Sequence, residues 1–485
     1  MALLMLRAIL VLLFLMPGLA GARDPAATDV RWYTVLLDGR KIGQFENRRE
    51  VHGERVLTRQ AMRIELDRAG TRVAMSSEES SEETLDGRPL AFANETRMSG
   101  SETSIAGSVD GSRMRVRIGT AGGFSERELD WPPGALLAEG LRLALLDVAL
   151  DEGAVFRTLA FQPSTFEAIE VTSTVGRSEM TGLPDGRLRL TRIEQSSAFP
   201  GATLRSTAWI DDRREVRKLA VPALGVELTM LACDQACATA PNQPADVFTR
   251  TLLRSPRPLR EAELAGGLRY RFAPLARGER IHLPASGDQQ VRGDGRRLVV
   301  EVRPGAGSDA TPPEAADFAA NAWLQSTAPE IVALAQRGVG AARNDGERMR
   351  NLETFVRGFI SRKTLGVGYA SALEVARRPE GDCTEHAVLL AALGRALGIA
   401  TRVVDGLAYA PGFAGAEQVF VPHAWVQAWV DGRWQGFDAA LAGFDAGHIT
   451  FSTGDGDPWR FYQALDLLGR LKLVRIEALD AGSGR

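Results

Sequence analysis

Cysteine and histidine are scarce in this sequence, with three and five copies among 485 residues. No second cysteine or histidine pair stands at the spacing of metal ligands, so a structural zinc site is not expected. Charge is nearly balanced, with 58 lysines and arginines against 61 aspartates and glutamates, and the basic residues form no stripe with aromatic ones. Nucleic-acid binding is therefore not expected. The sequence also lacks the glycine-rich fingerprints of phosphate and dinucleotide binding.

Long hydrophobic runs are missing except at the N-terminus. There, Arg7 precedes an apolar run at residues 8–16, and small residues at positions 20–22 follow a Pro-Gly break. This order is typical of a secretory signal peptide that is cleaved near Ala22. We expect residues 1–22 to be removed and the mature protein to be periplasmic or secreted. In the alternative the leader stays as a membrane anchor, although its apolar run is short for a bilayer span.

The three cysteines divide into a pair and a single residue. Cys233 and Cys237 lie four residues apart, and an export signal implies an oxidising compartment in which such a pair forms a disulfide. Cys383 is left over. A single thiol in an exported protein is either a buried small hydrophobe or a reactive group, and its sequence neighbours decide between the two.

Residues 23–245 are predicted to form a β-rich domain. Short alternating runs are separated by Asp-Gly dipeptides, as in LLDGRKIGQF and GLPDGRLRLTRI, and this combination is a strong hairpin signal. We expect a large antiparallel sheet or an open barrel, with helix confined to residues 136–150. The acidic run SSEESSEE at residues 76–83 is interpreted as a solvated strand face or loop or, in the alternative, as an acidic binding site.

Residues 246–310 retain strand character and are predicted to form a separate small β-domain. A connector rich in glycine, proline and aspartate then leads into helical patterns from about residue 315. These patterns belong to a third predicted domain at residues 311–485. The expected fold class is α+β, with antiparallel β-rich regions in the N-terminal part.

The segment GDCTEHAVLLAALGRALGI, residues 381–399, predicts a buried helix that begins at Cys383. Asp382 and, three residues later, Glu385 form a capping-box pattern, and a nearly continuous apolar stretch ends at Gly398. A thiol in the first turn lies at the positive end of the helix dipole, which favours its thiolate. Cys383 is therefore a candidate nucleophile, with backbone N–H groups at the helix start as candidate oxyanion donors.

The next segment, HAWVQAWVDGRWQGFDAAL, places a histidine and an aspartate on one face of a hairpin. If Asp431 and Gly432 form a two-residue turn, counting outward puts Trp425 opposite Asp438. His423 is then a diagonal neighbour of Asp438 on the same face, within side-chain reach. The carboxylate can fix the imidazole tautomer, so that the other ring nitrogen accepts a proton from a thiol.

A cysteine at a helix start, a histidine in one hairpin strand and an aspartate in the next are the residue types that thiol acyl transfer requires. Each residue alone is more often structural, but the combination favours a triad of Cys383, His423 and Asp438. The two segments quoted above resemble the core of bacterial transglutaminase-like proteins, in which GDC opens the nucleophile helix, HAW carries the base and the aspartate follows in the next strand. The resemblance implies a papain-like core, with the nucleophile helix packed on an antiparallel sheet, and the same three roles.

Four further residues receive weaker assignments. Trp425 is expected either to wall an acyl groove or oxyanion site or to fill the core. Tyr369 is a candidate second oxyanion donor. His386, three residues after the nucleophile, and His448 are expected to be structural.

Together these features predict an exported thiol acyltransferase or hydrolase that acts on amide or peptide bonds through a thioester on Cys383. The acceptor, water or an amine, is left open because groove shape and water access set it. No metal or organic cofactor is expected. The expected partner is a protein or peptide substrate, including components of the cell envelope, and a membrane only if the leader is retained. The alternative is a non-catalytic cell-envelope binding or assembly protein that keeps the same fold, since the β-rich part is larger than the predicted core.

Overall fold

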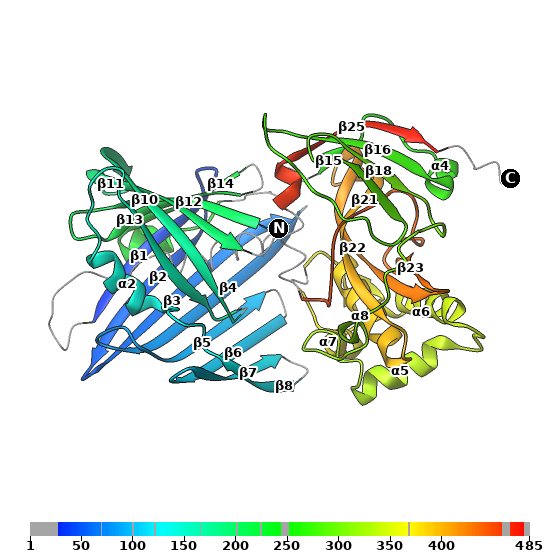
Figure 1. Cartoon of the computed structure of the whole chain (residues 1–485), viewed down its shortest axis with the longest axis horizontal. Helices are drawn as coiled ribbons and strands as arrows, with labels where there is room; N and C mark the ends of the chain where they lie inside the picture. The colour runs from blue at the N-terminus through cyan, green and yellow to red at the C-terminus, as the bar shows by residue number, and fades with distance from the viewer. Residues whose placement is uncertain are drawn as a thin grey trace.

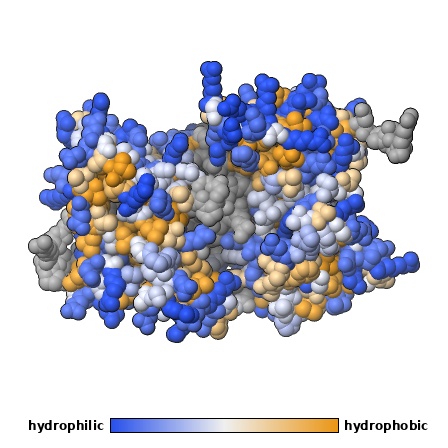
Figure 2. Space-filling view, viewed as in Figure 1, coloured by the Kyte–Doolittle hydropathy of each residue, from blue (hydrophilic) through white to orange (hydrophobic). Residues whose placement is uncertain are grey.

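The computed structural model describes residues 28–243, 252–457 and 466–479, apart from short gaps at residues 69, 99–100, 121–122, 165, 200–201, 224–225 and 367–368. The predicted leader, residues 1–22, lies outside the described residues. A strand-rich N-terminal half stands beside a C-terminal half that contains most of the helices (Figure 1). Hydrophilic side chains cover much of the face drawn in Figure 2, with hydrophobic groups gathered in places on both halves. Within the described ranges, no helix has the length and apolar character needed to span a bilayer.

The N-terminal half is built around a 14-stranded sheet whose neighbouring strands are all antiparallel. Its strands are β1 (Asp29–Leu37), β2 (Arg40–His52), β3 (Arg55–Arg68), β4 (Thr71–Thr84), β5 (Pro89–Met98), β6 (Ser101–Asp110), β7 (Arg113–Thr120), β8 (Gly123–Asp130), β9 (Val155–Gln162), β10 (Glu167–Leu183), β11 (Gly186–Phe199), β12 (Ala202–Ile210), β13 (Val216–Ala223) and β14 (Val226–Cys233). The order runs from β8 down to β1 and then from β14 down to β9, so two series of hairpins meet where β1 pairs with β14. The predicted Asp-Gly turns, such as residues 38–39 and 86–87, join successive strands. The prediction of a large antiparallel sheet is confirmed.

The acidic run at residues 76–83 lies within β4, and every second side chain in it is buried. The buried residues are Ser77, Glu79, Ser81 and Glu83. The expectation of a solvated face or loop is therefore wrong for these four, because the rest of the N-terminal half covers one face of the strand. Burial raises the pKa of Glu79 well above its ordinary value.

Glu83 caps the helix α2 (Ala138–Leu146), which is shorter than the predicted 136–150. Its carboxylate accepts the backbone N–H of Glu139 at 2.7 Å and that of Gly140 at 2.9 Å. Burial raises the pKa of Glu83 to about 7, although these two hydrogen bonds favour the charged form. The first turn of a helix has N–H groups without partners, and here an acidic residue of the sheet supplies the acceptor.

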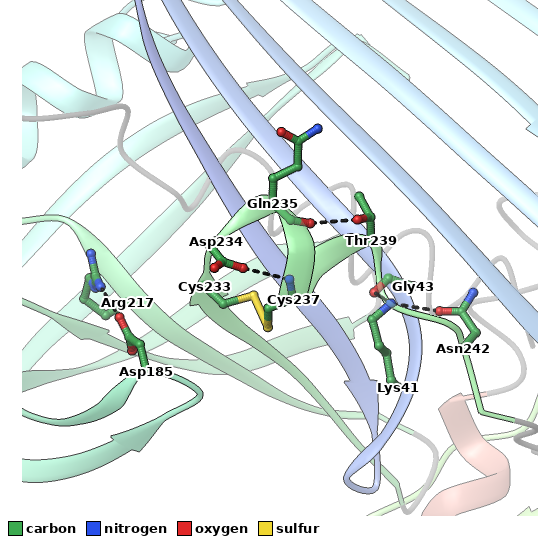
Figure 3. The surroundings of a disulfide bond; sticks show 10 residues. All are labelled: Lys41, Gly43, Asp185, Arg217, Cys233, Asp234, Gln235, Cys237, Thr239 and Asn242. Atoms are coloured by element: carbon green, nitrogen blue, oxygen red, sulfur yellow. Dashed lines mark hydrogen bonds and ion pairs between the residues drawn. A yellow bond between two sulfur atoms is a disulfide. The ribbon is translucent and has the colours of Figure 1, made fainter.

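Cys233 and Cys237, the predicted pair, are joined by a disulfide with their Cα atoms 6.0 Å apart. Between them, Asp234 accepts the N–H of Cys237 at 2.7 Å and so caps the short helix α3 (Gln235–Thr239) (Figure 3). The disulfide closes this turn directly after β14, the strand that pairs with β1.

Two further sheets build most of the C-terminal half. One has the order β15-β22-β21-β24, with β23 paired to β22, and the other has the order β17-β18-β16-β25. Their strands are β15 (Leu253–Arg254), β16 (Leu268–Pro274), β17 (Gln289–Gly293), β18 (Leu298–Val302), β21 (Thr401–Phe413), β22 (Ala416–Val430), β23 (Arg433–Phe437), β24 (His448–Gly454) and β25 (Leu471–Ala478). The short strands β19 (Arg362–Lys363) and β20 (Glu380–Gly381) form a separate parallel pair.

The segment 246–310, predicted as a separate small β-domain, shares its strands with the rest of the C-terminal half. It contributes β15 to the first sheet, while β16, β17 and β18 form the second sheet together with β25 from the end of the chain. The pairing of β16 with β25 joins segments that are far apart in the sequence. Local alternation predicts strands of this kind but not their partners.

The C-terminal half has five described helices, one of which packs against three of the others. They are α4 (Glu261–Gly266), α5 (Pro329–Val339), α6 (Asp345–Phe359), α7 (Ala372–Arg377) and α8 (Cys383–Ala396), with 3₁₀ turns at Ala315–Asp317 and Asp466–Gly469. Helix α8 packs against α5, α6 and α7 on one side and against β21 and β22 on the other. Every residue of α8 from Thr384 to Arg395 is buried, which explains why its sequence is apolar nearly all round.

Replacement of Glu83 by alanine tests the buried cap of α2. We expect Glu83→Ala to lower the free energy of unfolding by about 1–3 kcal/mol, because two buried N–H groups lose their acceptor. The matched control is Glu82→Ala, which removes the neighbouring carboxylate on the other face, where it pairs with Arg55. An exposed ion pair contributes at most about 1 kcal/mol. Urea unfolding measures both variants, and equal losses would contradict the assignment.

Candidate active site

Helix α8 begins at Cys383 and is capped as its sequence predicts. The Asp382 carboxylate accepts the N–H of Thr384 at 2.9 Å, and Glu385 accepts the N–H of Asp382 at 2.9 Å in return. Glu385 is completely buried and also accepts the N–H of Ala370 at 3.0 Å. Burial, together with the nearby Asp382 carboxylate, raises the pKa of Glu385 to about 8. Cys383 is partly exposed, at the positive end of a rigidly held helix.

Gly381, directly before the cap, has a backbone conformation that excludes other residues. Its φ is +148°, and a Cβ built there would lie 2.4 Å from the Cγ of Glu385. Backbone conformations with such φ values are strained for L-residues with a side chain. The Gly-Asp-Cys sequence therefore places a glycine where the chain passes close to the buried Glu385.

The histidine and the aspartate predicted to share a hairpin face are hydrogen-bonded. The register pairs Val430 with Arg433 and Val426 with Phe437, so the turn is at residues 431–432. His423 Nε2 lies 2.8 Å from Asp438 Oδ2.

Both groups of this pair are enclosed, with His423 6% exposed and Asp438 1% exposed. His423 lies on β22, one of the two strands against which the Cys383 helix packs. The structure therefore brings the imidazole and the carboxylate together beside α8.

Hydrogen bonds hold both the side chain and the backbone of Asp438. Its Oδ1 accepts the N–H groups of Ala440 at 2.7 Å and Leu441 at 3.2 Å, while its own N–H donates to Glu353 of α6 at 2.6 Å. The Arg357 guanidinium, also on α6, donates to the Asp438 carbonyl at 3.0 Å. Burial by itself raises the pKa of Asp438, but the histidines bonded to its carboxylate outweigh that effect and lower it.

A second histidine, which the sequence assigned a structural place, also contacts the aspartate. His448 Nε2 lies 3.0 Å from Asp438 Oδ2, the same oxygen that contacts His423. His448 is the first residue of β24, which pairs with β21 and not with the hairpin. No local pattern in the sequence predicts this contact, because it depends on the order of strands in the sheet.

Trp425 and Tyr369 have different surroundings. Trp425 is 1% exposed, its ring stacks beside that of His423 with centroids 6.2 Å apart, and its Nε1 has no hydrogen-bond partner among the described residues. It is therefore a core residue with a spare donor next to the imidazole. The Tyr369 hydroxyl donates its proton to the carbonyl of Gly456 at 2.6 Å. This geometry does not support the expected role of Tyr369 as an oxyanion donor.

His386 lies on α8 with its ring turned to the backbone. Its Nδ1 donates to the carbonyl of Asp382 at 2.6 Å, and the ring is 1% exposed. Burial lowers the pKa of His386. These contacts agree with the structural role expected from its position.

Among the described residues, His423, Asp438 and His448 form a group that could hold a metal ion, with donor atoms all within 4.8 Å of one another. Two features disfavour that use. Both Nε2 atoms point at one carboxylate oxygen at hydrogen-bond distance. Burial lowers the pKa of His448, but hydrogen bonds to Asp438 and Asp445 prevail and raise it to about 9, so a metal ion would have to displace that proton.

Comparison with known proteins gives one family match. Residues 332–439 match the model of the transglutaminase-like superfamily. None of the curated proteins matches the chain. The matched segment includes Cys383, His423 and Asp438, and it confirms the resemblance carried by the two sequence segments around them.

Three solved structures are similar in part. A proposed cysteine protease from Cytophaga hutchinsonii is 16% identical with a TM-score of 0.28, covering 44% of this chain and 84% of its own. A β-barrel-like protein of unknown function from Brucella abortus is 12% identical with a TM-score of 0.33, covering 44% of this chain and 98% of its own. A proposed protease from Parabacteroides distasonis is 15% identical with a TM-score of 0.21, covering 74% of this chain and 69% of its own.

Replacement of Gly381 by alanine tests the requirement for glycine before the nucleophile. We expect Gly381→Ala to lower the free energy of unfolding by about 1–3 kcal/mol, because the new methyl group meets Glu385 in a strained backbone conformation. The control is Gly358→Ala in α6, where a Cβ meets no atom within 4 Å. That variant should gain about 0.5–1 kcal/mol from helix propensity. Thermal and urea unfolding measure both, and an unchanged Gly381→Ala would refute the steric argument.

Proposed function

Because residues 332–439 form a transglutaminase-like domain, we propose that this chain is a cysteine enzyme that transfers acyl groups from amide or peptide bonds. The observation that carries the proposal is the 2.8 Å contact of Asp438 with His423, which lies on the strand β22 that packs against the Cys383 helix. A buried imidazole–carboxylate pair, on elements that adjoin the helix whose first residue is a partly exposed cysteine, supports the activation of that cysteine as a nucleophile.

The contact also indicates which ring nitrogen of His423 carries the hydrogen and which holds the lone pair. A carboxylate only accepts hydrogen bonds, so Nε2 carries the hydrogen and, in the neutral ring, Nδ1 holds the lone pair. Nδ1 is then the base for the Cys383 thiol. The buried carboxylate of Asp438 fixes this tautomer and stabilises the imidazolium that forms when the proton moves.

In the proposed reaction, Nδ1 of His423 takes the proton of Cys383, and the thiolate attacks the carbonyl carbon of an amide. The tetrahedral oxyanion collapses to a thioester as the C–N bond breaks, and the Nδ1 proton passes to the leaving amine. Water or a second amine then attacks the thioester and gives a proton to His423. The C–S bond breaks, the acid or new amide leaves, and the thiolate takes the proton back from His423. Water makes the protein an amidase or peptidase, and an amine makes it a transglutaminase.

The proposed oxyanion donor is Trp425. Its indole Nε1 is buried, lies in a ring stacked beside His423 and has no partner among the described residues. A buried donor without a partner is costly, and it gains a partner when an oxyanion forms. The dipole of α8 adds positive potential at Cys383.

Alkylation of Cys383 tests the activated thiol. At pH 6 an ordinary cysteine is almost wholly protonated, whereas a thiolate paired with imidazolium reacts readily with iodoacetamide. We expect His423→Ala to slow alkylation of Cys383 by about 100-fold and Asp438→Asn by at least about tenfold. The control is His52→Ala, which changes a surface histidine of the N-terminal sheet. Labelling is located and timed by mass spectrometry.

Two results are decisive for this test. Fast labelling of the wild type that collapses only in the His423 and Asp438 variants supports the enzyme. Slow labelling in the folded, reduced wild type, equal in every variant, contradicts it and leaves the alternative of a non-catalytic binding or assembly protein.

Trp425→Phe separates oxyanion stabilisation from thiol activation. Alkylation by iodoacetamide forms no oxyanion, so its rate should stay within about twofold of the wild type, while amide turnover should fall about 10²–10³-fold. Turnover is followed as hydrolysis of labelled casein and as incorporation of dansylcadaverine into casein. Equal losses in alkylation and turnover would indicate that Trp425 only fills the core.

A further inference from the structure

His423 and His448 share one oxygen atom of Asp438. Their Nε2 atoms lie 2.8 Å and 3.0 Å from Oδ2, and both rings must carry hydrogen on Nε2 because the carboxylate only accepts. The ring centroids are 5.6 Å apart, with the rings edge to face. With two N–H donors on the other oxygen, every strong acceptor direction of the buried carboxylate is used.

The other ring nitrogen of His448, Nδ1, also contacts polar groups. Nδ1 lies 2.9 Å from Asp445 Oδ1 and 3.1 Å from the Asp445 carbonyl, two acceptors that favour a hydrogen on Nδ1. The N–H of Asp445 points to the same nitrogen as a donor at 3.2 Å, the longest of the three distances. The carboxylate contact is the shortest of the three, which favours a hydrogen on Nδ1 and therefore an imidazolium between two carboxylates.

The surroundings of His448 contain few other charges. Beyond Asp438, Asp445 and His423, the titratable groups near Asp438 are Glu353 and Arg357 on α6 and His386 on α8, while Lys363 on β19 acts on His386. Aromatic rings fill the remaining space, with Phe444 and Trp425 at centroid distances of 4.8 Å and 5.2 Å from His448. His448 is 2% exposed, so its charge acts on its neighbours with little screening by solvent.

We propose that His448 is a positioning residue for the acyl transfer: it orients Asp438 toward His423 and sets how strongly Asp438 can stabilise the His423 imidazolium. The inference rests on the proposed function. The first effect is geometric, since a donor on Oδ2 and two on Oδ1 fix the carboxylate plane. The second is electrostatic, since a cation already paired with Asp438 repels a second cation that forms 5.6 Å away.

Two substitutions separate these effects. His448→Gln keeps an N–H donor near the position of Nε2 but removes the charge, and His448→Phe keeps the flat ring but removes both. The measurement is the rate of Cys383 alkylation by iodoacetate between pH 4 and 10. Iodoacetate is an anion that the imidazolium attracts, so the alkaline limb of that profile marks the loss of the proton from the thiolate–imidazolium pair.

The expected results differ between the variants. In His448→Gln the rate at pH 6 should stay within about threefold of the wild type, and the midpoint of the alkaline limb should move up by about one pH unit as the repelling charge is lost. In His448→Phe the rate should fall about 10- to 100-fold, because Asp438 is no longer held in place. A residue that only fills space would leave the midpoint unchanged.

Thermal unfolding checks the charge on His448 independently. The pKa of His448 is raised to about 9 in the folded protein, so the stabilisation from its proton is complete below about pH 6.5 and is lost as the pH rises through about 9. Between pH 7 and 10 the wild type should therefore lose more thermal stability than His448→Gln. Parallel losses would show that His448 is neutral and would overturn the electrostatic part.

The remaining outcomes separate a failure of the proposed function from a failure of the role of His448. A wild type without an alkaline limb refutes the proposed function and the role of His448 with it. If the midpoint of the alkaline limb is the same in His448→Gln as in the wild type, and His448→Phe reacts as fast as the wild type, only the role of His448 is refuted. Stoichiometric zinc binding by the wild type that both substitutions abolish would reassign His423, Asp438 and His448 to a metal site and overturn the proposal.

Discussion

The buried carboxylate of Asp438 is the constraint on which the candidate site depends. A carboxylate that is 1% exposed is stable only if it is surrounded by donors, and here the donors come from His423, His448 and the backbone of residues 440 and 441. The two histidines lie on different strands of the sheet, and the two backbone donors lie in the loop after β23. The hairpin register, the position of β24 and the course of the loop are therefore coupled through one side chain.

The same constraint links the sheet to the helices. Glu353 and Arg357 of α6 bind the backbone of Asp438, and α6 packs against α8, whose first residue is Cys383. In the first turn of α8, Glu385 is buried behind the helix cap and accepts two backbone N–H groups. The start of α8, the His423 imidazole and the Asp438 carboxylate are thus each held by buried polar contacts, and support of this kind keeps side chains in position.

The N-terminal half uses buried polar residues in a different way. Its sheet is a series of hairpins closed by the β1–β14 pair, and acidic residues such as Glu83 point inward to bind the start of α2. These contacts orient the sheet and its helix. They also show that alternate acidic side chains along a strand can be buried when they accept backbone N–H groups that have no other acceptor.

The sequence alone determined the features that depend on neighbours along the chain. The Asp-Gly turns predicted hairpins, the capping box and apolar stretch predicted α8 from its first residue, and counting outward from residues 431–432 brought His423 to Asp438. Each of these follows from short-range geometry: turn type fixes register, and register fixes which side chains share a face.

Tertiary structure alone decided the rest. The pairing of β16 with β25 joined a predicted separate domain to the end of the chain, and the burial of one face of β4 brought Glu79 and Glu83 inside. The order of β22, β21 and β24 placed His448 on Asp438. Alternation along a strand shows which residues share a face, but which strand lies beside it, and what covers that face, depend on contacts between segments distant in the sequence.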